Sequence, residues 1–215
     1  MRIITGRYKG RHFDIPRSFK ARPTTDFAKE NIFNVLNRYI DFEGATALDL
    51  FSGTGSISLE LLSRGCSQVV SVEADRDHHR FICDCLQKLA GKGTLPSVLP
   101  IRGDVFRFLK SCHQQFDFIF ADPPYALKEL PQIPDMIIER QLLKADGVFV
   151  FEHGKGYDFS THPHFVEHRS YGSVNFSLFK ATATAIGSAT PRNDSGTSDG
   201  TDEALSPKES TAVDP

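Results

Sequence analysis

Residues 45–55 read Ala-Thr-Ala-Leu-Asp-Leu-Phe-Ser-Gly-Thr-Gly (ATALDLFSGTG), a short apolar run that ends in a glycine-rich turn. The apolar run predicts a buried β-strand, and Gly53 and Gly55 predict a tight turn into a helix over residues 56–64. Ligands of open α/β sheets bind beyond the carboxyl ends of such strands. The stretch therefore predicts the first strand of a parallel α/β sheet, with a binding site at its end.

The alternation of strand-like and helix-like patterns continues along the chain. Further strands are expected at 68–74, 97–104, 116–122 and 147–153, and helices near 76–90, after 104 and near 132–144. The runs 166–172 and 174–180 are joined tightly enough to form an antiparallel hairpin. We therefore predict a doubly wound α/β fold, with a mostly parallel seven-stranded sheet and an antiparallel edge strand.

The two ends of the chain differ in charge and composition. Residues 1–22 are rich in Arg and Lys, and residues 2–15 alternate and break at glycines, which predicts a basic β-hairpin extension and a polyanionic partner. The α/β domain is expected to cover residues 23–181 and to begin with a capped helix start at residues 22–26. Residues 182–215 are acidic, contain no aromatic residue and are expected to be disordered.

Bulk composition limits the class of protein. The 215 residues are 40% hydrophobic and 24% charged, with a formal net charge of −2, as in an ordinary globular domain. The four cysteines and eight histidines show no metal-like grouping, so we expect reduced thiols and no metal. The N-terminus is too charged for a signal peptide, and no long apolar run exists. We therefore expect a cytoplasmic protein without a membrane partner.

Acidic residues follow three successive predicted strands. Asp49, Glu73 and Asp104 are expected to converge on one crevice at the carboxyl edge of the sheet. Glu73 follows Gly53 by 20 residues, the spacing at which an acid binds ribose hydroxyls. Ser58 stands where a dinucleotide-binding turn has its third glycine, and the Asp49 carboxylate suits a cationic amino acid end better than a diphosphate. The pattern favours S-adenosylmethionine over NAD.

A second motif, FADPPYAL at residues 120–127, ends the fourth predicted strand. It is either a strand exit with a capping aspartate or a set of functional groups beside the same crevice. In the second case, Asp122 and the stiffly held carbonyl of Pro123 would accept hydrogen bonds from an exocyclic amino group of a base. Tyr125 would stack on that base. The target base would have to be unstacked to enter the site.

Four segments together resemble one known family. They are Arg2-Ile3-Ile4-x-Gly6-x-x-Lys9-Gly10-Arg11, Arg22-Pro23-Thr24-x-Asp26, the run from Asp49 to Gly55, and Asp122-Pro123-Pro124-Tyr125. In this order and spacing they resemble the RsmD family, whose members methylate N2 of one guanine of bacterial 16S rRNA, guanine 966 in the customary numbering. The resemblance covers residues 2–181 and leaves the tail unexplained.

The resemblance implies a Rossmann-like class I methyltransferase fold, S-adenosylmethionine as the cofactor, and 16S rRNA or a partly assembled small ribosomal subunit as the partner. It assigns cofactor binding to Asp49, Phe51, Gly53, Gly55, Glu73 and Asp104. It assigns catalysis to Asp122, Pro123, Pro124 and Tyr125. The basic residues that we expect to bind RNA phosphates are Arg7, Lys9, Arg11 and Arg22. We expect a monomer.

Three other functions stay open at this point. Asp-Pro-Pro-Tyr also serves DNA adenine-N6 methyltransferases, although about 181 folded residues leave no room for a separate DNA-recognition domain. An NAD-dependent oxidoreductase would use a similar glycine turn, but the third glycine and an obvious proton donor are absent. A non-catalytic RNA-binding module would keep the fold without the chemistry.

Overall fold

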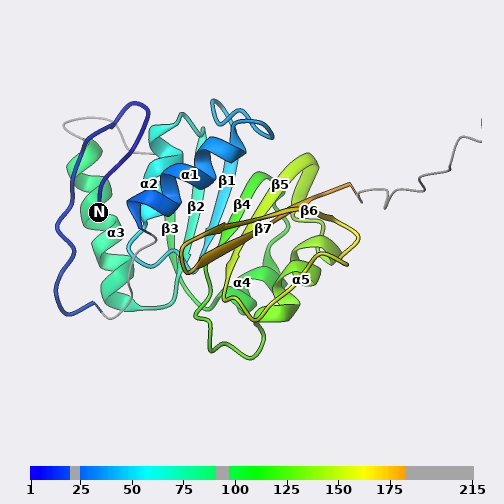
Figure 1. Cartoon of the computed structure of the whole chain (residues 1–215). Helices are drawn as coiled ribbons and strands as arrows, with labels where there is room; N and C mark the ends of the chain where they lie inside the picture. Colours follow the sequence, from blue (N-terminus) through cyan, green and yellow to red (C-terminus); the bar gives the residue numbers. More distant parts are fainter. Residues whose placement is uncertain (20–24, 91–96, 183–215) are drawn as a thin grey trace, which may run out of the picture. The chain divides into compact units, whose positions relative to one another are not determined.

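The structure, a computed structural model, describes residues 1–19, 25–90 and 97–182 (Figure 1). Its helices are α1 (Asp26–Leu36), α2 (Ser56–Ser63), α3 (Arg76–Ala90), α4 (Val105–Ser111), the short 3-10 helix η1 (Leu130–Gln132) and α5 (Ile133–Glu139). Its strands are β1 (Thr46–Leu50), β2 (Gln68–Glu73), β3 (Val98–Arg102), β4 (Phe116–Ala121), β5 (Leu143–His153), β6 (Phe165–Tyr171) and β7 (Val174–Lys180). None of the helices in the described ranges is long and apolar enough to cross a membrane.

The strands form one seven-stranded sheet in the order β3-β2-β1-β4-β5-β7-β6. The strands from β3 to β5 are all parallel, whereas β7 pairs antiparallel with both β5 and β6. The predicted fold class is confirmed, with one refinement: both hairpin strands join the sheet, and β7 lies between β5 and the edge strand β6. The chain order reverses between β1 and β4, so this sheet has a topological switch point at its centre.

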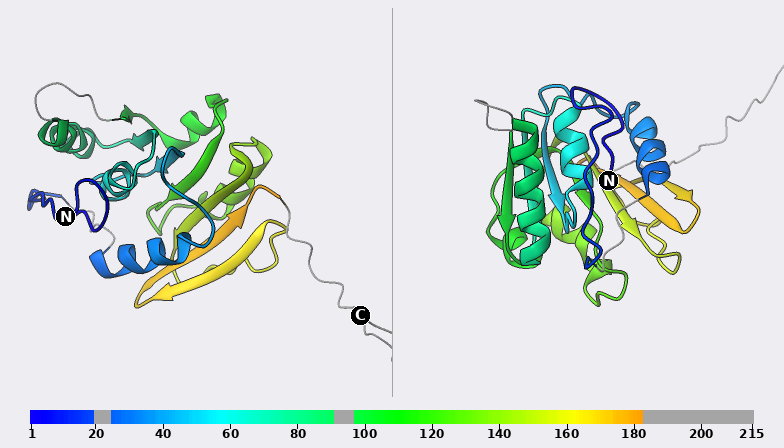
Figure 2. Two further views of the ribbon diagram at one scale, coloured as in Figure 1. Left: turned by 90° about the horizontal axis from the view of Figure 1, so that it is seen from above. Right: turned by 90° about the vertical axis from the view of Figure 1, so that its left-hand side faces the viewer.

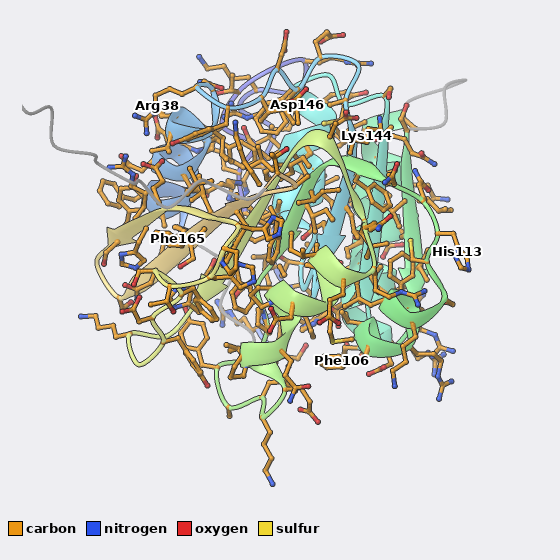
Figure 3. All side chains as sticks on the ribbon, turned by 90° about the vertical axis from the view of Figure 1, so that its right-hand side faces the viewer. Arg38, Phe106, His113, Lys144, Asp146 and Phe165 are labelled. Carbon is orange, nitrogen blue, oxygen red and sulfur yellow. The ribbon has the colours of Figure 1, made fainter. Side chains whose placement is uncertain are left out.

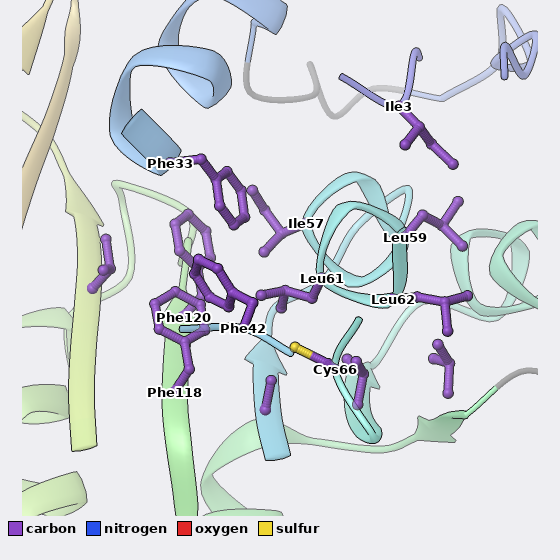
Figure 4. Close-up of a cluster of buried hydrophobic side chains, with 14 of the residues drawn as sticks. Ile3, Phe33, Phe42, Ile57, Leu59, Leu61, Leu62, Cys66, Phe118 and Phe120 are labelled. Atoms are coloured by element: carbon purple, nitrogen blue, oxygen red, sulfur yellow. The ribbon is translucent and has the colours of Figure 1, made fainter. Parts of the chain in front are cut away.

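Helices cover both faces of the sheet, as Figures 1 and 2 show. Helices α1, α2 and α3 share one hydrophobic cluster with one face, and α4 and α5 share a second cluster with the other face. Neighbouring strand residues such as Phe118 and Ile119 fall in different clusters because successive side chains of a strand point to opposite faces. Figure 4 shows the aromatic centre of the first cluster, where Phe42 packs 5.4 Å from Phe33 and 5.3 Å from Phe118 between ring centroids.

Two predicted elements differ from those in the structure. The helix expected near 132–144 is shorter, because Gln141 adopts a left-handed φ of 53° and ends the helical path. Strand β5 therefore begins at Leu143, ahead of the apolar run at 147–153, and its pairing with β4 shifts register between Phe116 and Phe118. Figure 3 shows the first residues of β5, Lys144 and Asp146, at the opposite end of the sheet from Phe106 of α4.

The predicted N-terminal hairpin is an antiparallel arm with little regular structure. Its two sides form a single β-bridge, Arg2 with His12, and main-chain hydrogen bonds join Ile3 to Arg11 and Met1 to Phe13. The arm runs beside α2 and α3 (Figure 2, right). The following helix starts as expected, since Thr25 Oγ1 caps α1 by accepting a hydrogen bond from Ala28 N at 3.2 Å. The predicted tail beyond residue 182 lies outside the described residues.

Candidate active site

The turn after β1 has an unusual backbone. Phe51, Gly53 and Gly55 have positive φ angles of 58°, 52° and 75°. For Phe51 this left-handed conformation costs about 1–2 kcal/mol, and such strain is concentrated at functional sites. A Cβ on Gly55 would lie 2.8 Å from Ile82 Cγ1, so only glycine lets α2 begin this close to α3. The turn therefore brings the main chain to the switch point at some energetic cost.

Asp49 lies at the end of β1, with only 1% of its surface exposed. Its Oδ2 accepts hydrogen bonds from Ser58 N at 2.9 Å and from Ser58 Oγ at 2.5 Å. Asp49 therefore caps α2, whose N-cap residue Gly55 has no side chain to do so. The pKa of Asp49 is raised to about 7, chiefly by burial; the hydrogen bonds from Ser58 oppose this shift, and the charge of Glu73 contributes to it.

Glu73 ends β2 and braces the glycine turn. Its Oε2 accepts a hydrogen bond from Gly53 N at 2.7 Å, and its Oε1 accepts one from Asp75 N at 2.8 Å. The spacing of 20 residues between Gly53 and Glu73 therefore corresponds to a direct contact. Each carboxylate oxygen keeps a second lone pair with which it can accept a bond from a ligand hydroxyl.

Asp104 follows β3, the strand beside β2, and has a structural role of its own. Strand β3 ends at Arg102, and Asp104 instead caps α4 by accepting a hydrogen bond from Arg107 N at 2.8 Å. Its carboxylate is exposed, and the preceding Gly103 N donates to Glu73 O at 3.0 Å, so Asp104 lies beside the end of β2. The structure therefore brings Asp49 and Glu73 to the switch point, and the place of Asp104 in the same crevice stays a prediction.

Asp122 follows β4 directly beside the end of β1, because its main-chain N–H donates to Leu50 O at 3.3 Å. Its pKa is raised well above the usual aspartate value, first by burial of the carboxyl group and then by the charges of Glu152 and Asp49. Pro123 is buried and Pro124 is exposed. The motif therefore lies at the switch point, as predicted, with a carboxyl group that holds its proton more tightly than usual.

Tyr125 is anchored at its hydroxyl and open along its ring. The hydroxyl donates to Glu152 Oε1 at 3.2 Å, while 45% of the residue is exposed. Gly154 lies beside the ring, where a Cβ would make an ordinary van der Waals contact of 3.5 Å with Tyr125 Cδ2. Burial, followed by the charges of Glu152 and Asp122, raises the pKa of Tyr125. The ring is held at one end and can receive a planar group.

Glu152 is a functional candidate that sequence reasoning missed. It lies one residue before the end of β5, is only 4% exposed, and holds Tyr125 while acting electrostatically on Asp122. The signal was present in GVFVFEH, residues 147–153, where an acid interrupts an apolar run at the carboxyl end of a strand. An acid at that position of a buried parallel strand points to a site rather than to a solvated surface.

The basic residues of the N-terminal arm are exposed, while its main chain is anchored on α2. Ile4 N and Thr5 N donate to the Glu60 carboxylate at 2.7 and 3.1 Å, and Arg7 N donates to Ser63 O at 2.7 Å. The side chains of Arg7 and Lys9 extend into solvent.

Two other basic residues of the predicted RNA-binding set differ from this pair. Arg11 is exposed, but its Nη2 donates to Lys88 O of α3 at 3.1 Å. Arg22 lies outside the described residues. The structure therefore shows an exposed basic arm formed by Arg7, Lys9 and Arg11, fixed beside α2 and α3.

Comparison with known proteins places this geometry in a family. The family model described as "Conserved hypothetical protein 95" matches residues 1–180. The chain belongs to this family.

Its curated members include Ribosomal RNA small subunit methyltransferase D of Haemophilus influenzae, 30% identical over 184 residues that cover 84% of this chain and 93% of the relative. The same enzyme of Buchnera aphidicola (strain Bp) is 29% identical and covers 71% of this chain and 75% of the relative. The family is thus the RsmD family that the motifs resemble.

Solved structures agree with the family's fold. A hypothetical protein from Thermus thermophilus superimposes with a TM-score of 0.72 at 26% identity, covering 84% of this chain and 99% of that chain. The Thermus thermophilus 16S rRNA N2 methyltransferase RsmC, in complex with AdoMet and guanosine, gives a TM-score of 0.59 at 18% identity, covering 76% of this chain and 45% of that chain. At that identity the second likeness concerns the fold alone, which is the Rossmann-like class I methyltransferase fold.

Proposed function

We propose that this member of the RsmD family transfers a methyl group from S-adenosylmethionine to the exocyclic N2 of one guanine of 16S rRNA, the position of guanine 966, during maturation of the small subunit. The observation that carries the proposal is the position of Asp122 and Tyr125 at the switch point, beside the strained turn after β1. The names of the family's curated members support rRNA as the substrate. Such a substrate implies action in the cytoplasm.

The charge of the site fits a cationic cofactor. Four carboxyl groups, those of Asp49, Glu73, Asp122 and Glu152, lie at the ends of neighbouring strands. In addition to burial, the charges of Glu152 and Asp49 raise the pKa of Asp122, and the charge of Glu73 raises that of Asp49. A diphosphate would be repelled there, whereas a sulfonium and an ammonium group would be attracted. S-adenosylmethionine has both cations and, when bound, supplies the methyl group. No group of three metal-ligating side chains occurs within the described ranges, and the proposed transfer requires none.

Individual roles at the cofactor follow from the contacts. Asp49 holds the start of α2, and Glu73 holds the Gly53 turn and keeps lone pairs for the ribose hydroxyls. Phe51 packs edge-on against Phe106, at 6.2 Å between centroids, and forms an apolar wall for the adenosine. We include Gly55 and Asp104 in the same site, as the family resemblance implies, with Asp104 acting through the start of α4.

Catalysis is proposed to depend on positioning of the amino group. The Asp122 carboxyl group and the Pro123 carbonyl accept hydrogen bonds from the two amino protons, which directs the nitrogen lone pair toward the methyl group. Pro123 and Pro124 have fixed φ angles, so the carbonyl needs little reorganisation. Tyr125, held by Glu152, stacks on the base. Exposed Arg7, Lys9 and Arg11 bind RNA phosphates, and we extend this role to Arg22.

The test is a methylation assay with S-adenosylmethionine and three substrates, namely 16S rRNA, partly assembled small subunits and duplex DNA, followed by nucleoside analysis. We expect N2-methylguanine in RNA. In the variant Asp122→Ala, transfer should fall by about 10²–10³-fold while cofactor binding in calorimetry is retained. The control Asp146→Ala removes an acid at the opposite end of the sheet and should retain activity. Appearance of N6-methyladenine in DNA without N2-methylguanine would replace the proposal by the DNA-methyltransferase alternative.

A further inference from the structure

Three arginines surround a shallow depression of about 570 Å³ between α3 and the end of β3. Its lining consists of Arg76, His79, Arg80, Cys83 and Arg102. The first four residues recur at helical spacing and so occupy one face of α3. The depression therefore results from the packing of one helix face beside one strand end, and not from a single loop.

The depression lies at the same edge of the sheet as the candidate active site. Arg102 is paired in register with Glu73, the acid that braces the glycine turn. Three strand spacings of about 4.8 Å separate β3 from β4, so the end of β3 lies roughly 14 Å along the edge from Asp122. Stacked nucleotides advance about 3.4 Å each, and a strand of roughly four nucleotides spans this separation.

No carboxylate of the described ranges forms an ion pair with the guanidinium groups of this depression. Arg76, Arg80 and Arg102 are exposed, and within the described ranges no hydrogen bond or ion pair engages their guanidinium groups. By contrast, the side chains of four other arginines each pair with a carboxylate, namely Arg2, Arg38, Arg64 and Arg169. Clustered cations without partners repel one another unless an anion joins them.

The remaining lining residues do not neutralise the cluster. His79 Nε2 lies 3.4 Å from Pro100 O and His79 Nδ1 lies 4.0 Å from Cys83 Sγ, so both groups are turned toward protein partners. Burial and the neighbouring Asp84 raise the pKa of the Cys83 thiol, which keeps it uncharged near neutrality. The depression therefore presents a net positive surface to an approaching ligand.

We propose that this depression binds backbone phosphates of the RNA a few nucleotides away from the target base, as a second anchoring site beside the basic arm. This inference rests on the proposed function for its ligand. Planar guanidinium groups bind phosphate oxygens through paired N–H donors, and an unpaired arginine loses no internal contact on doing so. The target base then enters the site from a strand that is held a few nucleotides away.

The test compares two variants that each lose two positive charges. The variant Arg80→Gln/Arg102→Gln removes two guanidinium groups of the depression. It keeps Arg76, because Arg76 is the nearest of the three in sequence to Glu73, the acid that braces the glycine turn. The control Lys88→Gln/Lys110→Gln removes two exposed charges near the far ends of α3 and α4. Binding of a fluorescent 16S rRNA transcript is measured by anisotropy over a range of salt concentrations, and S-adenosylmethionine binding is measured by calorimetry.

We expect the depression variant to bind the transcript at least about tenfold more weakly at low salt, with the slope of log K against log salt reduced by about 1.4–1.8. Its cofactor affinity and melting temperature should equal those of the unaltered protein, and the control should keep most of the RNA affinity. Equal losses in the two variants would overturn the inference while leaving the proposed function intact. If the unaltered protein binds the cofactor but no rRNA, the proposed function fails first, and the RNA ligand of this site fails with it.

Discussion

Asp49 is a fully buried carboxylic acid whose pKa of about 7 lies where cellular pH fluctuates. Burial favours its protonated form, whereas the two donors of Ser58 favour the charged form. The folded protein thus keeps a proton on Asp49 at pH values at which the unfolded chain has already lost it. The stability of the folded protein therefore depends on this proton.

We predict that the stability of the ligand-free protein falls as pH rises from about 4 toward 7. Because the folded pKa of Asp49 is raised from 3.8 to about 7, its stabilising contribution is complete below pH 4 and is lost as pH passes through the folded pKa, by at most about 4 kcal/mol. Urea unfolding at pH 5 and pH 8 measures the difference. The variant Asp49→Asn should show a smaller difference, and the control Asp146→Asn an unchanged one. An equal pH dependence in all three proteins would contradict the assignment.

The same residues show what sequence patterns can predict about a site. The spacing of Gly53 and Glu73 predicts their proximity, because parallel strands place both at one edge. The hydrogen bond from Ser58 to Asp49 was not predictable. The presence of serine at the third-glycine position does not indicate which residue its hydroxyl contacts. Asp104 shows a second limit: an acid just after a strand is also an acid just before a helix, and the pattern did not predict that it caps α4.

Among the structural elements, the N-terminal arm departs furthest from its prediction. Alternating residues and two glycines predict a hairpin, but among the described residues only one bridge forms. Residues 1–3 bond across the arm to residues 10–13, whereas residues 4–8 use their main-chain groups on α2. The polar face of α2, formed by Ser56, Glu60 and Ser63, receives this arm and Lys29. The spacing of these three residues predicts that they share one face of α2. It does not predict which segment of the chain packs on that face.

We predict that Gly6→Ala displaces the arm, whereas Gly10→Ala does not. Both glycines have left-handed φ angles, 84° and 81°, so both substitutions carry the same backbone strain. A Cβ on Gly6 would lie 1.8 Å from Ser63 O, whereas a Cβ on Gly10 would meet nothing within 4 Å. Gly6→Ala should therefore cost about 1–3 kcal/mol more in urea unfolding. It should also make the arm a faster site of tryptic cleavage. Equal effects would show that the arm does not dock closely at Gly6.

Across the whole described domain, one buried ion network joins the arm, α1 and α2. Lys29 is 0% exposed and donates to Arg2 O at 2.7 Å and to Ser56 Oγ at 3.0 Å. Its Nζ lies 3.8 Å from Glu60 Oε2, and Arg64 Nε donates to Glu60 Oε1 at 3.0 Å. Burial lowers the pKa of Lys29, an effect that Glu60 and Asp26 oppose. Three separate segments therefore share one buried polar centre.

We predict that Lys29→Met destabilises the domain by about 3–5 kcal/mol, because the Glu60 carboxylate loses a buried counter-charge. The double variant Lys29→Met/Glu60→Gln should lose less than the sum of the two single losses, which a double-mutant cycle in urea unfolding measures. Lys88→Met, which alters an exposed lysine of α3, serves as the matched control. A cost for Lys29→Met no larger than that of the control would exclude the network as a stabilising centre.

The anchoring of the arm has an evolutionary consequence. The main-chain N–H groups of Ile4, Thr5 and Arg7 make the contacts that hold the arm to α2. Every amino acid except proline has this N–H group, so these contacts do not depend on the side chain. Mutations at Arg7 and Lys9 can therefore drift or be selected without loss of the folded arm, provided that Gly6 is kept. A lineage can change the charge and shape of this exposed arm while inheriting the same scaffold. A directed-evolution library confined to these two codons would explore new substrates at little risk to folding.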